Sequence, residues 1–138
     1  MARYSFTLTS GKEIVVSARN KRVSTSTFLN RLEHYAYTIL IEINGNKYQT
    51  TFHDCNYNYL QNKGADKNML CTALDCVMTD GDSYDYNRNL EDFAYEYGYE
   101  EDMKKAEKAF NACKKAYEFF KANLTSDEYE EISKTYIR

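Results

Sequence analysis

Four residues in the middle of the chain are of types that bind metal ions or act as nucleophiles. They form the series His53-x-Cys55, then Cys71-x4-Cys76. Structural zinc usually takes four such ligands in tighter pairs, typically Cys-x2-Cys or His-x3-His. Five positions along a helix would turn Cys71 and Cys76 about 140° away from each other. The spacing therefore favours core packing for these cysteines, and we expect neither a metal site nor a cofactor.

Nucleophilic catalysis is not indicated either. His53 and Cys55 would share one face of a strand, but a Cys–His pair also needs a third group that orients the base. No residue is singled out for that role. The five glycines are scattered, so the chain has no phosphate-binding loop and no dinucleotide fingerprint. Cys113 falls in an apolar helical pattern, where cysteine acts as a small hydrophobe. We therefore expect a protein without enzymatic activity.

The most distinctive feature is a block of negative charge. Residues 80–102 contain nine acidic residues and one arginine, in a chain whose net charge is only −3. Acids in the first turn of a helix complement the helix dipole, which accounts for positions 91, 92 and 100–102. No helix role accounts for the aspartates and tyrosines of residues 80–86. Such a field attracts a basic partner, and tyrosine is a common interface anchor. We predict a partner-binding surface, a mimic of a nucleic-acid backbone, made of Asp80, Asp82, Tyr84, Asp85, Tyr86, Glu96 and Tyr99.

A basic cluster in the first half of the chain offers an alternative. Residues 1–50 have a net charge of +4. Four of the cations lie in or near the loop that we expect after the second strand: Arg19, Lys21, Arg22 and Arg31. Each phosphate that such a surface neutralises adds affinity for nucleic acid. Direct nucleic-acid binding by a regulatory protein therefore stays open beside the acidic interface, and so does homodimer formation.

Length and composition are those of one soluble domain. The chain has 138 residues, 43% hydrophobic and 28% charged. No apolar run approaches the roughly 20 residues of a membrane span. The N-terminus shows no basic and then apolar signal region. We expect a cytoplasmic protein with reduced cysteines.

The elements that must position these residues change type half-way along the chain. Alternating apolar residues predict four antiparallel strands, at residues 4–9, 13–19, 35–43 and 47–53, with one face covered by helices. Asn44-Gly45 predicts a type I′ hairpin turn. A short helix is expected over residues 24–34, between the second and third strands, and a loop over residues 54–65.

From residue 66 the period of the apolar pattern changes from 2 to 3.6, which predicts helices. They are expected at residues 66–78, 89–97, 100–123 and from 126 onward, with a break at residues 79–86. Asn89 should cap the second helix, Gly98 should end it, and Thr125 with Glu128 should form a capping box before the last. The third helix has an apolar seam of Met103, Ala106, Phe110, Cys113, Tyr117, Phe120 and Leu124. The predicted fold is a single α+β domain, with a sheet half at 1–53 and a bundle of about four helices at 66–138.

The stretch LEDFAYEYGYEEDMKKAEKAFNAC, residues 90–113, resembles a motif of small uncharacterised proteins of bacteriophages and other mobile elements. The motif is carried here by Asp92, Phe93, Glu96, Tyr97, Gly98, Tyr99, Asp102, Lys104, Lys105, Ala106, Phe110, Ala112 and Cys113. The similarity covers roughly residues 70–131. It implies a phage accessory protein with no assigned catalytic residues. By analogy of class, the expected function is inhibition of host defence, as in anti-CRISPR proteins, with a CRISPR effector or other defence nuclease as partner.

Overall fold

The structure is a computed structural model that describes residues 2–25, 33–54 and 67–137. The chain divides into two compact units. The sheet unit comprises residues 1–74 and 131–138, and the helical unit comprises residues 75–130. The division falls inside a helix, whereas the sequence suggested a change between residues 54 and 66.

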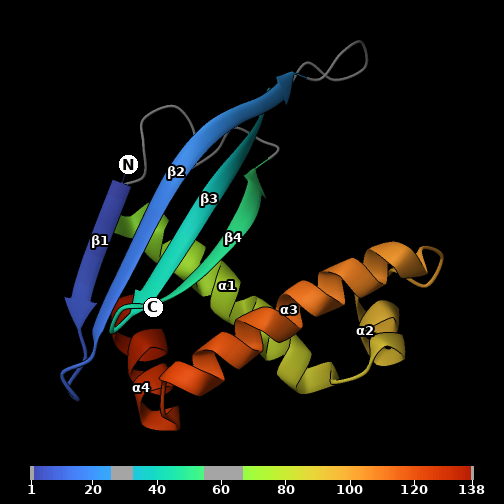
Figure 1. Cartoon of the computed structure of the whole chain (residues 1–138). Helices are drawn as coiled ribbons and strands as arrows, with labels where there is room; N and C mark the ends of the chain where they lie inside the picture. Colours follow the sequence, from blue (N-terminus) through green and yellow to red (C-terminus); the bar gives the residue numbers. More distant parts are fainter. Residues whose placement is uncertain (1, 26–32, 55–66, 138) are drawn as a thin grey trace. The chain divides into compact units, whose positions relative to one another are not determined.

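The sheet unit contains four antiparallel strands in sequence order (Figure 1). They are β1 (Ala2–Thr7), β2 (Glu13–Thr25), β3 (Glu33–Ile43) and β4 (Asn46–Asp54). The helices follow in the second part of the chain. The predicted α+β class, with its four-stranded N-terminal sheet, is therefore confirmed.

The second strand is longer than predicted. β2 continues to Thr25, and Ser24 and Thr25 pair with His34 and Glu33 of β3. The two ends of the expected helix at residues 24–34 are thus strands, because pairing with β3 supplies their backbone hydrogen bonds. The middle of that helix, residues 26–32, lies outside the described residues, as do residues 55–66 of the expected loop.

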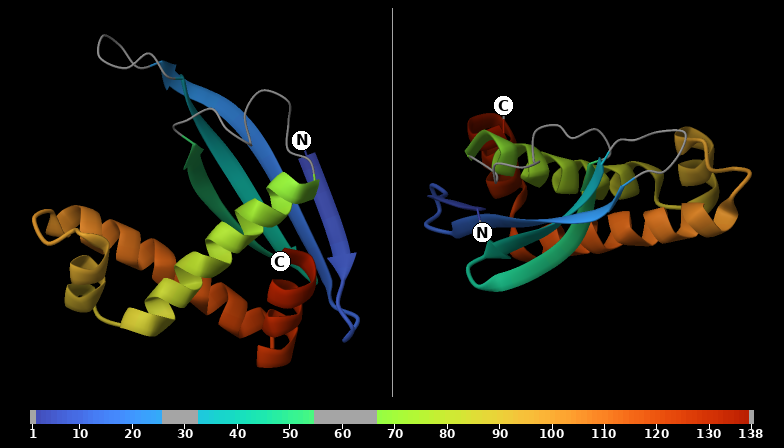
Figure 2. Two further views of the ribbon diagram at one scale, coloured as in Figure 1. Left: turned by 180° about the vertical axis from the view of Figure 1, so that it is seen from behind. Right: turned by 90° about the horizontal axis from the view of Figure 1, so that it is seen from above.

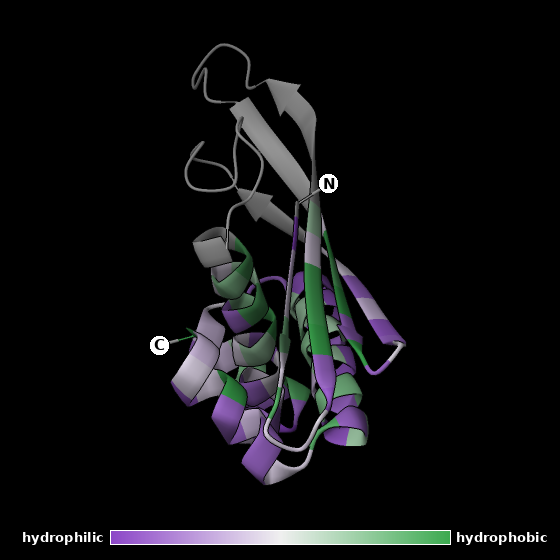
Figure 3. Ribbon diagram, turned by 90° about the vertical axis from the view of Figure 1, so that its left-hand side faces the viewer, coloured by the Kyte–Doolittle hydropathy of each residue, from purple (hydrophilic) through white to green (hydrophobic). Residues whose placement is uncertain are grey.

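Alternate positions of the strands form the core of the sheet unit. Ile14 pairs with Ile43, and Val16 pairs with Ile41. All four side chains are buried, and each contributes about 1.5–3 kcal/mol relative to an exposed position. Val15, which points to the opposite face, is buried as well. Figure 3 shows hydrophobic residues in the described parts of the strands and mixed positions along the helices.

The β3–β4 hairpin turns at Asn44-Gly45, as predicted. Both residues have positive φ, 48° and 87°. The Asn44 side chain accepts a hydrogen bond of 2.9 Å from the Glu13 N–H. The Asn44 N–H donates to the Glu13 carbonyl at 3.0 Å. One residue therefore fixes the hairpin turn and anchors it to the start of β2.

The C-terminal residues complete the sheet unit. They form the π-helix η1 (Ile132–Ile137), in which Ile132 is buried. The ring of Tyr136 stacks on Phe6 of β1 with centroids 3.9 Å apart. Glu131 accepts a hydrogen bond of 2.9 Å from the Thr9 N–H. The two ends of the described chain are therefore packed together.

Four α-helices follow the sheet: α1 (Lys67–Asn87), α2 (Leu90–Tyr97), α3 (Met103–Asn123) and α4 (Ser126–Glu131). Figure 2 shows α1 and α3 as the two long helices. The predicted caps are present. Asn89 accepts from the Asp92 N–H, and Gly98 ends α2 with φ 75°. Glu128 accepts from the Thr125 N–H at 2.8 Å, and Thr125 accepts from the Glu128 N–H at 3.2 Å.

Two details of the helical half differ from the sequence prediction. Asp102 is the N-cap of α3, so Glu100 and Glu101 precede the helix and do not belong to its first turn. The apolar seam of α3 starts at Ala106, because Met103 is exposed. Tyr97, the last residue of α2, is exposed, although its ring packs on Phe93 with centroids 4.9 Å apart.

Candidate partner-binding surface

The segment that was expected to break the helical pattern is helical. α1 runs without interruption through residues 79–86 to Asn87. Gly81, within the expected break, lies against the backbone of α3. A Cβ built on it would be 3.3 Å from both the Cα and the N of Tyr117. The glycine is therefore a point of close helix packing, within the pair of helices that Figure 2 shows crossing.

Polar side chains in this part of α1 form hydrogen bonds with backbone carbonyls of the same helix. The Ser83 hydroxyl donates to the Thr79 carbonyl at 3.0 Å, and the Asn87 amide donates to the Ser83 carbonyl at 3.0 Å. The helix ends at Asn87 and is followed by Arg88, which has a positive φ of 54°. Its N–H donates to the Tyr84 carbonyl at 2.8 Å. These bonds let α1 continue where composition alone suggests a loop.

Helical geometry divides the five predicted residues of α1 between two sides. Successive residues of a helix rotate by about 100°. Asp82, Asp85 and Tyr86 therefore lie on one side, which we call the α1 face. Asp80 and Tyr84 lie on another. The structure thus brings together three of the five residues and separates the other two from them.

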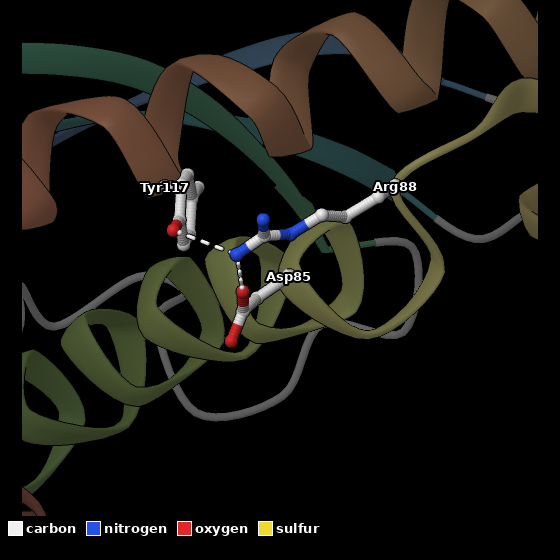
Figure 4. A network of polar contacts seen from close by, with 3 residues as sticks. All are labelled: Asp85, Arg88 and Tyr117. Carbon is white, nitrogen blue, oxygen red and sulfur yellow. Dashed lines mark hydrogen bonds and ion pairs between the residues drawn. The ribbon is translucent and has the colours of Figure 1, made fainter.

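The aspartates of the α1 face have partners within the helical unit. Asp82 accepts a hydrogen bond of 2.7 Å from the Tyr129 hydroxyl. Asp85 forms an ion pair with Arg88. The Arg88 guanidinium also donates to the Tyr117 hydroxyl at 3.0 Å, so that it joins a carboxylate of α1 to a phenol of α3 (Figure 4).

Burial changes the acidity of Tyr129. Desolvation raises the pKa of its hydroxyl, and the hydrogen bond to Asp82 together with the charge of that carboxylate raises the pKa further. The same hydroxyl lies 3.2 Å from the Met78 carbonyl. Tyr129 is therefore a neutral donor that holds α4 against α1 inside the helical unit.

On the other side of α1, Tyr84 packs against α3, whereas Asp80 is exposed. The Tyr84 ring is half-buried, with centroids 5.2 Å from Phe110 and 5.3 Å from Tyr117 of α3. Desolvation raises the pKa of the Asp80 carboxyl. Its charge adds to burial in raising the pKa of the Cys113 thiol to about 12. A thiol with that pKa stays protonated near neutral pH and is a poor nucleophile.

A second acidic face lies on α2. The helix buries Phe93 and Ala94, which turns four other residues outward: Glu91, Asp92, Tyr95 and Glu96. We call them the α2 face. The sequence prediction included Glu96 but missed Tyr95, which is 78% exposed. The buried positions 93 and 94 were the signal that could have identified it, because residue 95 lies well away from both on the helix.

Two tyrosines are candidates of different kinds. Tyr86, on the α1 face, is 80% exposed. Tyr99 is half-buried and stacks on Phe93 with centroids 6.0 Å apart. The ammonium group of Lys105 lies 5.8 Å from the centre of the Tyr99 ring. Tyr86 is therefore available to a partner, whereas much of Tyr99 is used within the helical unit.

A pocket of about 390 Å³ opens beside the α1 face. Asp82 and Asp85 form one wall, with Gly81. α3 contributes Tyr117, Phe120 and Lys121, and the turn into α4 contributes residues 124–126 together with Tyr129. The pocket combines carboxylates and hydroxyls with an aromatic surface. All of its residues belong to the helical unit.

The residues of the alternative basic site lie in a strand and not in the expected loop, as far as the structure describes them. Arg19, Lys21 and Arg22 lie in β2, paired with Thr38, Ala36 and Tyr35, and not in a loop. Arg31 lies outside the described residues. Three of the four cations are therefore strand residues, because β2 is longer than predicted. A loop position stays a prediction for Arg31 alone.

The residues considered for metal binding do not form a cluster in the described ranges. Cys71 is buried and Cys76 is half-buried on α1, and Cys55 lies outside those ranges. Among the residues that the structure describes, no three His, Cys, Asp or Glu side chains are placed to hold a metal ion. In the same residues, no helix combines the length and apolar character needed to cross a membrane.

Comparisons of the chain with protein-family models, curated proteins and solved structures give no match.

Proposed function

We propose that this protein is a phage-encoded, non-enzymatic inhibitor that binds a host defence nuclease, with a CRISPR effector as the first candidate. Its acidic faces on α1 and α2 would occupy a basic groove that otherwise holds nucleic acid. The proposal is supported by exposed tyrosines next to carboxylates on the helical unit. The sequence resemblance to phage proteins supports the phage origin, and the class of partner follows by analogy with other small phage proteins.

The observation that carries the proposal is the composition of the α2 face. Glu91 and Asp92 lie in the first turn of α2, where the helix dipole favours acids. Glu96 lies in the last turn, where the dipole disfavours a negative charge. Tyr95 is 78% exposed, and burying a tyrosine ring in an interface gives large contact area at a small entropy cost. Neither residue has a packing role that explains its type.

The charge around these residues supports a basic partner. Residues 75–130, which form the helical unit, contain 15 acidic and 7 basic residues. Six of the seven cations are lysines of α3, beyond Asp102. The negative charge is therefore concentrated on α1, on α2 and on the segment before α3. A concentrated field accelerates the encounter with a basic groove and makes binding depend on salt.

The proposal is tested with purified CRISPR effectors of several types. Each is mixed with the chain, and both binding and nuclease activity are measured with and without competing nucleic acid. We expect one effector to bind, and nucleic acid and the chain to compete for it. A gel shift with non-specific DNA at low salt tests the alternative function, direct binding of nucleic acid. If the chain retains DNA and binds no effector, it is instead a nucleic-acid-binding regulator acting through residues such as Arg19, Lys21 and Arg22.

A further inference from the structure

We propose that the pocket beside the α1 face receives an arginine side chain of the partner, whose guanidinium group replaces Arg88 on Asp85. This inference rests on the proposed function, because it names the side chain that a basic partner contributes. The pocket volume of about 390 Å³ lies at the lower end of the range for ligand pockets. It exceeds what an ion needs and suits one long side chain.

The first argument is that the chain already binds a guanidinium at the edge of this pocket. Arg88 pairs with Asp85 and donates to the Tyr117 hydroxyl. Its guanidinium carbon also lies 5.5 Å from the centre of the Tyr117 ring. Asp85 and Tyr117 both line the pocket. A carboxylate, a phenol oxygen and an aromatic face are the groups that recognise arginine most effectively.

The second argument concerns the other residues that line the pocket. Asp82 accepts one hydrogen bond from Tyr129, and a carboxylate can accept about four. Phe120 and Leu124 offer apolar surface for the methylene groups of an arginine. Lys121 is the one cation among the lining residues. It offsets part of the negative charge, so the wall of Asp82, Asp85 and Lys121 keeps a formal charge of −1.

The third argument is that Arg88 is a replaceable occupant. Its side chain is 60% exposed, and water and salt screen an exposed ion pair so that it contributes little to stability. Its φ of 54° is a conformation that glycine adopts more easily than arginine. An incoming guanidinium that is also enclosed by Asp82 and Phe120 makes contacts that Arg88 lacks. The exchange therefore favours the partner side chain once the partner is docked.

The test uses N-acetyl-arginine amide as a probe and N-acetyl-citrulline amide as its neutral counterpart of almost the same shape. Both are titrated into the isotope-labelled full chain, and amide chemical shifts are recorded. We expect saturable shifts at residues 82–85, 117–121 and 124–126 with the arginine probe, and none with the citrulline probe. Equal shifts with both probes, or no shifts with either, would overturn the proposal.

Three variants sharpen the result. Asp82→Asn with Asp85→Asn should weaken probe binding by about tenfold, the equivalent of one charged hydrogen bond. Glu107→Gln on the exposed surface of α3 is the matched control and should bind as the unmodified chain does. Arg88→Gly should strengthen binding, because the internal competitor is gone and glycine suits the positive φ. Unchanged binding in the double variant, or weaker binding in Arg88→Gly, would contradict the assignment.

The outcome is separable from that of the proposed function. If the probe does not bind but the chain still inhibits an effector, the pocket inference fails and the function stands. If the probe binds as expected and no effector does, the pocket stands and the choice of partner fails.

Discussion

Gly81 of α1 lies so close to Tyr117 of α3 that a single added carbon would be 3.3 Å from the Tyr117 backbone. Backbone atoms cannot rotate away as a side chain can. The contact therefore fixes the distance between the two helices that carry the pocket. It also explains why a glycine stands in the middle of a helix, where it costs up to about 1 kcal/mol relative to alanine.

The first prediction concerns this contact. Gly81→Val should lower the free energy of unfolding by about 1–3 kcal/mol, since overpacking forces the helices apart. Chemical denaturation followed by circular dichroism measures the change. Ala112→Val, at an exposed position of α3, introduces the same side chain outside the contact and should cost at most about 0.7 kcal/mol, the helix-propensity difference between alanine and valine. Similar losses in both variants would show that the close contact is not what Gly81 provides.

The second prediction concerns the hydrogen bond between Tyr129 and Asp82. Tyr129→Phe removes a donor from a carboxylate and should lower stability near neutral pH by about 1 kcal/mol. The folded pKa of Tyr129 is raised, so its stabilising contribution is complete below the unfolded pKa of about 10 and is lost as the pH rises above it. Thermal melts of both proteins from about pH 8 to pH 11 should therefore converge. A difference that stays constant over this range would refute the role of the protonated hydroxyl.

The third prediction concerns Cys113, whose thiol pKa is raised to about 12 by burial and by Asp80. At a mildly alkaline pH its reaction with iodoacetamide should be far slower in the folded protein than in urea, because thiolate is the reactive form. Mass spectrometry of the peptide that contains Cys113 measures the two rates separately from those of the other cysteines. Comparable rates would mean that the residue is not held in the core of the helical unit.

Much of the fold could be predicted because it is encoded locally. Asn44-Gly45, Asn89, Gly98 and the pair Thr125 and Glu128 act on their own neighbours, and each forms the turn or cap that its type indicates. Alternation of apolar residues similarly identified the strands. These signals need no knowledge of distant parts of the chain.

The errors arose where distant residues decide the structure. A break was expected at residues 79–86 because nothing near Gly81 shows that residue 117 will pack against it. The polar end of β2 lacked an apolar alternation, yet pairing with β3 extends the strand to Thr25. Distant contacts also decide how the predicted acidic surface is divided between the two sides of α1. Once α1 is helical through residue 87, Asp80 and Tyr84 turn away from Asp82, Asp85 and Tyr86. Tyr95 is the more exposed of the two exposed tyrosines of α2.

A fourth prediction follows from the exposure of Tyr86. Tyr86→Ala should leave the melting temperature within about one degree of the original value, since surface substitutions change stability by at most about 0.5 kcal/mol. Tyr84→Ala, which removes a ring packed on Phe110 and Tyr117, should lower it clearly. Differential scanning calorimetry compares the two. Equal effects would contradict the assignment of Tyr86 to a binding face and of Tyr84 to the packing between α1 and α3.

The most direct test of the central claim is the affinity for an inhibited effector of a chain carrying Tyr95→Ala and Glu96→Lys on the α2 face. We expect binding to weaken by at least about tenfold, with a smaller dependence on salt because one favourable charge is reversed. Glu107→Lys on α3 introduces the same charge change outside both faces and should bind nearly as tightly as the unmodified chain. Unchanged affinity and unchanged salt dependence in the α2 variant would contradict binding through the acidic, tyrosine-bearing helical unit.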